Sequence, residues 1–129
     1  MRILMSAGCF GLIFASSAFA LDPATTRQLK ALTPSERLEQ RCDMEAMSRI
    51  GKEKRGLSPD KVIAYTFGKT LADGSHLRAP GAVVRSKGAW YRLKYDCVAT
   101  NGNLDIKSFS YQVGAEVPKA SWGKYYLYD

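Results

Sequence analysis

The chain has 129 residues, with 19 Lys or Arg against 12 Asp or Glu, so its formal net charge is +7. A chain of this length is expected to form one domain around one hydrophobic core. Hydrophobic residues make up 46% and charged residues 24%, which excludes disordered, collagen-like and coiled-coil chains. Three cysteines are too few for a disulfide-dense mini-protein or a four-cysteine zinc module.

The first twenty residues have the pattern of a secretory signal peptide. Arg2 precedes an apolar stretch from Ile3 to Phe14, and the small-x-small triplet Ala18-Phe19-Ala20 follows. This order predicts cleavage between Ala20 and Leu21. A transmembrane anchor is the alternative, but the apolar stretch is too short for one.

Two cysteines remain after such a cleavage, because Cys9 leaves with residues 1–20. In an oxidising compartment an even number of cysteines indicates a disulfide, so we predict that Cys42 pairs with Cys97. A redox pair or a metal site is the alternative. Neither has support, since the sequence has no Cys-x-x-Cys and a single histidine.

The N-terminal part of the exported chain predicts one clear helix. Residues 21–32 are polar, and we expect a flexible lead-in with at most a short helical turn. Thr33, Pro34 and Glu36 then form the capping box of a helix start. Gly51 is expected to end this helix. Its buried face is predicted from apolar residues at spacing four, which are Leu38, Cys42, Ala46 and Ile50.

The rest of the chain predicts a second helix and then strands. Ser58, Pro59 and Asp60 repeat the start signal, so residues 58–68 are interpreted as a short helix. After Gly74 the pattern changes to strands. Their expected ranges are 76–78, 82–85, 90–99 and 104–113.

Asn101-Gly102 predicts a two-residue hairpin turn between the last two strands. In this register Cys97 faces Ile106, and one β-bulge near Lys107 keeps the apolar side chains on one face. Beyond the bulge Tyr95 faces Phe109, Leu93 faces Tyr111 and Tyr91 faces Val113. Residues 33–129 are thus predicted to form a single α+β domain. Its N-terminal helices pack on one face of a small antiparallel sheet, and one disulfide joins helix to sheet.

Several segments resemble domain-of-unknown-function family 930, in the same order along the chain. They are residues 37–47 around Cys42, residues 77–82, residues 90–97 ending at Cys97, and the segment from Val117-Pro118 to Trp122. The resemblance covers roughly residues 33–122. It implies a small exported protein of alphaproteobacteria with an envelope or host-associated role. It transfers no catalytic residue.

Motifs of common catalytic sites are absent from the sequence. It contains no Gly-rich phosphate loop, no Gly-x-Ser-x-Gly and no metal-binding histidine pair. His76 is its one histidine, and no activated nucleophile stands near it in sequence. Glu39, Asp43 or Glu45 would have to supply a carboxylate pair for glycoside cleavage, but such spacing is ordinary on a helix surface. We therefore predict no enzymatic activity, no metal and no cofactor.

Two groups of residues are candidates for contact with a partner. Aromatic-rich surfaces with few charges are typical of protein contacts, although packing of the C-terminal tail on the sheet is the alternative. This candidate partner surface comprises Trp90, Arg92, Trp122, Tyr125, Tyr126 and Tyr128. Lys52, Lys54 and Arg55 are candidate contacts to an anionic envelope surface, including the surface of a membrane, and a solvated loop is the alternative.

Together these patterns predict an exported, non-enzymatic binding protein in the periplasm or outside the cell. Its expected partner is another protein or an anionic envelope component, and not a nucleic acid, because export and scattered charges argue against one. One alternative is a virulence effector passed to a host cell by a type IV secretion system. A small cell-envelope hydrolase is the other.

Overall fold

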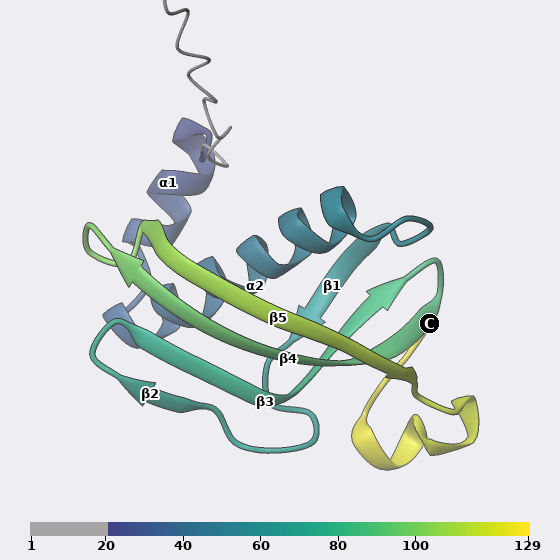
Figure 1. Ribbon diagram of the computed structural model, residues 1–129. Helices are drawn as coiled ribbons and strands as arrows, with labels where there is room; N and C mark the ends of the chain where they lie inside the picture. Colours follow the sequence, from purple (N-terminus) through teal and green to yellow (C-terminus); the bar gives the residue numbers. More distant parts are fainter. Residues whose placement is uncertain (1–20) are drawn as a thin grey trace, which may run out of the picture.

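The computed structural model describes residues 21–129, so the predicted signal peptide lies outside the described residues. In this part of the chain two helices precede five strands of one antiparallel sheet and two 3₁₀ turns (Figure 1). The elements are α1 (Pro23–Lys30), α2 (Pro34–Glu53), β1 (Pro59–Ile63), β2 (Leu71–Asp73), β3 (His76–Ser86), β4 (Ala89–Thr100), β5 (Asp105–Glu116), η1 (Lys119–Ser121) and η2 (Gly123–Tyr125). The predicted α+β class is confirmed.

Helix α2 begins as the sequence predicts. The Thr33 hydroxyl accepts the Glu36 backbone N–H at 3.3 Å, and a Glu36 carboxylate oxygen accepts the Thr33 N–H at 3.1 Å. This capping box satisfies two backbone donors that a helix start otherwise leaves unpaired. The helix runs through Gly51 to Glu53, two residues beyond the predicted end. Its predicted apolar face is buried along its full length.

The lead-in before α2 is more ordered than predicted. Residues 23–30 form helix α1, because Asp22 caps its first turn by accepting the Thr25 backbone N–H at 2.7 Å. The Arg37 guanidinium then joins the two helices by donating to the carbonyls of Leu29, Lys30 and Leu32 at 2.9–3.1 Å. Arg37 is on α2, so this contact could not be read from the polar composition of residues 21–32.

The predicted second helix at residues 58–68 is wrong. Residues 59–63 form strand β1, which pairs antiparallel with β3. Short apolar runs do not separate helix from strand, and here the β-branched Val62 and Ile63 favour the strand. Pro59 opens an edge strand, where its missing N–H is tolerated. Ser58 does not begin a helix. Its N–H donates to the Ser86 hydroxyl at 2.8 Å, which ties the start of β1 to the end of β3.

Strand β3 is one strand of eleven residues and not the two short strands predicted. One of its edges pairs along β4, while the other pairs first with β2 and then with β1. The register shifts between Ala79 and Ala82, where the chain preceding β2 crosses over. There the Phe67 N–H donates to the Gly81 carbonyl at 2.7 Å. A Cβ on Gly81 would lie 2.3 Å from the Gly68 nitrogen, so this crossing requires glycine.

The β4–β5 hairpin keeps the predicted bulge but not the predicted turn. Asn101, Gly102 and Asn103 all have positive φ, and the turn spans residues 101–104. The longer turn moves the register. In the observed pairs Ala99 faces Ile106, Cys97 faces Phe109, Tyr95 faces Tyr111 and Leu93 faces Val113, while Tyr91 faces Glu116 after a second irregularity. The shift at Lys107 confirms the bulge, and the apolar side chains share one face as predicted.

The two faces of the sheet carry separate apolar clusters, where one core was expected. The helix-side core lies between α2 and the sheet and contains the confirmed Cys42–Cys97 disulfide. Neighbouring residues Val83 and Val84 point to opposite faces, so only Val84 belongs to this core. On the other face the chain after β5 folds back over the sheet (Figure 1). There it forms the tail-side core, which consists of Val83, Trp90, Val117, Trp122 and Leu127.

Candidate functional site

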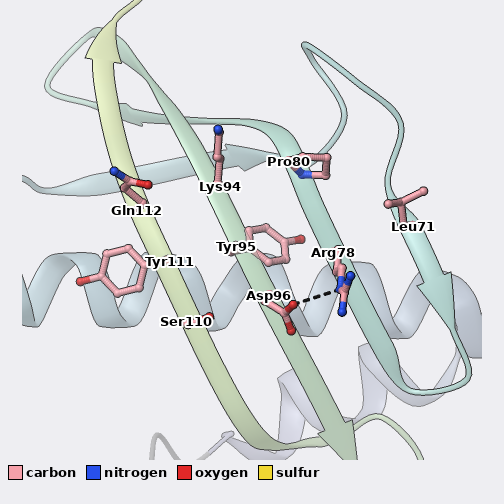
Figure 2. Close-up of a pocket in the computed structure, with 9 residues that line it drawn as sticks. All are labelled: Leu71, Arg78, Pro80, Lys94, Tyr95, Asp96, Ser110, Tyr111 and Gln112. Carbon is pink, nitrogen blue, oxygen red and sulfur yellow. Dashed lines mark ion pairs between the residues drawn. The ribbon is translucent and has the colours of Figure 1, made fainter.

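The tail-side core covers one part of the sheet's outer face, and another part stays open to solvent. This second part, the open outer face, forms a shallow hollow of about 380 Å³ across β2, β3, β4 and β5 (Figure 2). Side chains alternate along each strand, so a set from several strands points out of the sheet here. Its exposed or half-exposed members are Leu71, Arg78, Pro80, Lys94, Asp96, Ser110 and Gln112.

Asp96 is the centre of the charge arrangement on the open outer face. Its carboxylate accepts from His76 Nε2 at 2.6 Å and from Arg78 Nε at 3.2 Å. Figure 2 shows the Arg78–Asp96 pair toward one end of the hollow. All three side chains are about one-third exposed or more, so water screens these pairs and they add little to stability.

Lys94 carries a positive charge on the open outer face and forms no ion pair with Asp96. It projects from the middle of β4 next to Gln112 of β5, its partner in register (Figure 2). Among residues 21–129 no ion pair, hydrogen bond or ring contact of its ammonium group is found. An ammonium group with three free donors beside hydroxyl and amide side chains suits an anionic oxygen.

A stack of aromatic and cationic side chains marks the border between the open outer face and the tail. The Arg92 guanidinium lies 3.9 Å from the centre of the Phe67 ring. Phe67 in turn contacts Tyr125, with 4.4 Å between ring centres. Arg92 is exposed, and through Phe67 this stack connects β4 to the segment before β2 and to the tail.

Only some residues of the predicted aromatic partner surface are exposed to solvent. Trp90 is fully buried and Trp122 is 8% exposed, because both belong to the tail-side core. Their indole N–H groups donate to the carbonyls of Tyr128 and Val117, at 2.8 and 3.2 Å. Tyr126 and Tyr128 remain exposed. The structure therefore favours the packing role of the tail over the recognition role.

The predicted basic residues lie together where α2 ends. Lys52, Lys54 and Arg55 are all exposed. The Lys54 ammonium lies 5.9 Å from the centre of the Tyr111 ring on β5, and the Tyr111 hydroxyl donates to Glu53 at 2.7 Å. This end of α2 therefore contacts the far edge strand of the sheet.

Two buried polar clusters on α2 were not predicted. Arg41 and Arg49 both pair with Glu45, each at 3.0 Å, and the spacing of four residues could have indicated this. Asp43 accepts from the Tyr95 hydroxyl at 2.7 Å beneath the helix. Burial raises the pKa of Asp43 to about 7, with Glu39 adding to the rise, while Tyr95 and Lys61 oppose it. Tyr95, the partner of Asp43, lies on β4, so no local sequence pattern could have indicated this contact.

Three of the candidate catalytic groups are paired with other side chains in the described part of the chain. His76 pairs with Asp96, but the outward serines Ser108 and Ser110 lie two strands away on β5, roughly 10 Å across the sheet. Asp43 and Glu45, considered as catalytic carboxylates, are held by Tyr95 and by two arginines. Within residues 21–129 no group of three or more metal-ligating side chains is found.

A membrane-crossing helix is also not found: no helix among the described residues combines the length and the apolarity that a span requires. The fold and the open outer face define the class as a small α+β protein with a helix-to-sheet disulfide and an exposed polar sheet face.

The family model described as Domain of Unknown Function (DUF930) matches residues 29–127, and the chain belongs to this family. The match confirms the resemblance that the cysteine-containing segments indicated. Neither the curated proteins nor the solved structures include a significant match.

Proposed function

We propose that this protein is an exported, non-enzymatic binding protein that holds an anionic partner in the periplasm or outside the cell. The observation that carries the proposal is Lys94, an exposed ammonium group in the middle of the open outer face with Asp96 already engaged by His76 and Arg78. Arg92 adds a second positive charge at the border of the same face. Phosphate or carboxylate groups of an envelope component are the ligands that such a face would take.

The compartment follows from two features. The signal-peptide pattern of residues 1–20 directs export, and the buried Cys42–Cys97 disulfide supports an oxidising destination. Fractionation of cells that produce a C-terminally tagged protein tests this part. Tagged protein in the periplasm or medium, beginning at Leu21 by mass, supports export. Unprocessed protein in the cytoplasm would contradict it.

Binding is tested with the purified, disulfide-bonded protein and vesicles with or without an anionic phospholipid. We expect retention on the anionic vesicles that decreases as salt increases, since exposed charges are screened. Lys94→Gln should weaken retention severalfold, while Lys69→Gln, which removes an exposed charge before β2, serves as the matched control. Equal loss in the two variants would show unspecific charge attraction. Loss only when Lys52, Lys54 and Arg55 are changed together would move the contact to the end of α2.

A further inference from the structure

The described part of the sheet has three edge strands, and they differ in how they are protected. Proteins blunt exposed edges with short strands, prolines and charges, because unpaired backbone groups recruit other strands. Strand β1 has five residues and begins with Pro59, Asp60 and Lys61, and β2 has three residues. Strand β5 has twelve residues, and within residues 21–129 only β4 pairs with it. Its central segment, residues 108–113, has no charge, proline or glycine.

The side chains on both faces of this β5 segment are compatible with an additional strand at the edge. On the outer side Ser108, Ser110 and Gln112 are exposed. On the helix side Phe109, Tyr111 and Val113 are half-buried, because α2 covers them only in part. An added strand would complete the burial of these apolar side chains and would also pair the free backbone groups of the edge.

The charges beside the segment select the kind of strand. The Arg49 guanidinium lies 5.5 Å from the centre of the Phe109 ring, and the Lys54 ammonium lies 5.9 Å from that of Tyr111. The nearby acids are already engaged: Glu45 by Arg41 and Arg49, and Glu53 by the Tyr111 hydroxyl. Arg41, Arg49 and Lys54 together carry three positive charges against the two negative charges of Glu45 and Glu53, so the helix side of the edge is net positive by one charge.

We propose that the edge of β5 at residues 108–113 binds an extended acidic segment of a partner protein, which adds as a strand with acidic side chains toward Arg49 and Lys54. A second copy of this chain fits less well. Pairing β5 with β5 about a two-fold axis would bring the same cations of two α2 helices together, and like charges at close range oppose association. The inference rests on the proposed role as a binding protein, but not on the open outer face.

The test uses the full exported protein and a synthetic ten-residue peptide in which glutamate alternates with valine or threonine. Fluorescence anisotropy with a labelled peptide measures the affinity. We expect binding that is lost when alternate backbone amides are N-methylated in one register and retained when the other register is methylated, because only one set faces β5. The same peptide with lysine in place of glutamate should bind at least about tenfold more weakly.

The matched protein variants are Lys54→Gln, which removes the cation above Tyr111, and Lys69→Gln, which precedes β2, a strand that β3 and β4 separate from β5. Lys54→Gln should weaken peptide binding about threefold at low salt, and Lys69→Gln should leave it unchanged. Both positions are exposed, so equal thermal melting of the variants checks that the fold is intact.

Several outcomes would overturn the inference. They are no binding of the glutamate peptide, equal effects of methylation in both registers, equal binding of the lysine peptide, or a dimer in sedimentation that the peptide does not dissociate. Peptide failure with retained binding to anionic vesicles would reject strand addition and leave the proposed function standing. Loss of both would reject both.

Discussion

The two faces of the sheet are covered in different ways. On the helix side a twenty-residue helix buries four regularly spaced residues against the strands, and a disulfide fixes it there. On the tail side the last residues of the chain, without a regular helix, bury two tryptophans by packing and two indole hydrogen bonds. Aromatic residues at a chain end can therefore stabilise the fold and need not form a recognition surface. On the outer face, a partner can contact only the parts that the tail leaves open.

Removal of the tail should have the largest effect on this comparison. A stop after Val117 removes Trp122 and Leu127 from the tail-side core and exposes Trp90. Losses of about 3–5 kcal/mol for a buried tryptophan and 2–5 kcal/mol for a leucine predict a destabilisation of at least about 5 kcal/mol. Urea unfolding measures it.

Tyr126→Asn is the control for the tail, because Tyr126 is 88% exposed and its positive φ suits asparagine. Its stability should change by less than about 0.5 kcal/mol. A truncated protein with unchanged unfolding would mean that the tail packs without contributing stability, and the recognition role would then be restored.

Loss of the disulfide tests the helix side. Cys42 and Cys97 are 55 residues apart, and the chain-entropy model gives about 4 kcal/mol for a loop of this length. Cys42→Ala should lower stability by about this amount. The reduced parent protein is the matched comparison, and its urea midpoint should equal that of the variant. Unfolding of Cys42→Ala at the parent's urea midpoint would contradict a stabilising role for the disulfide.

Asp43 sets the pH dependence of the helix side. Because its folded-state pKa of about 7 exceeds the usual 3.8, the folded protein keeps a proton that the unfolded chain releases between these values. Stability is therefore greatest below the lower value and falls as pH rises toward the upper one. We expect a loss of about 3 kcal/mol between about pH 5 and pH 8.

Asp43→Asn keeps an acceptor for the Tyr95 hydroxyl but carries no titrating proton. Its stability should therefore vary much less over the same pH range. If urea unfolding of the parent and the variant showed the same pH slope, another group would have to account for it.

The smallest expected effect lies at the border between the covered and open parts of the outer face. Arg92→Ala removes the cation that stacks on Phe67, and an exposed contact of this kind is worth about 0.5–1 kcal/mol. Arg92→Lys keeps a positive charge and should lose less. Thermal melting of the two variants measures the difference. A destabilisation as large as that of the truncation would mean that Arg92, rather than the apolar packing, holds the tail.

Local signals predicted the parts of the fold that depend on near neighbours. The capping box at Thr33 and the bulge at Lys107 are set by a few adjacent residues. The Cys42–Cys97 pairing followed from counting and compartment alone. The predicted hairpin turn was two residues too short, because a contact with another element sets its length. Asn103 adopts a positive φ and donates to the Pro34 carbonyl at 3.0 Å, which ties the turn to the start of α2.

The candidate site was less accessible to sequence reasoning. The pairing of His76 with Asp96 joins residues twenty positions apart, and it depends on the register of β3 with β4. Trp90 was expected in the candidate partner surface, but it is buried in the tail-side core. The tail that covers it has no periodic pattern, so its path over the sheet could not be derived. What stays exposed depends on that path.

The disulfide also decides how the protein responds to a protease. The link between Cys42 and Cys97 closes a covalent ring that contains the exposed segment after α2 and the whole of β1, β2 and β3. A single cut in this ring, for example after Lys54 or Arg55, leaves one molecule whose mass grows by a water and whose two pieces separate only on reduction. The β4–β5 turn and the tail lie outside the ring. A cut there leaves a C-terminal piece that no disulfide joins to the rest of the protein. A nicked but intact protein can thus persist where trypsin-like enzymes act on its basic segment.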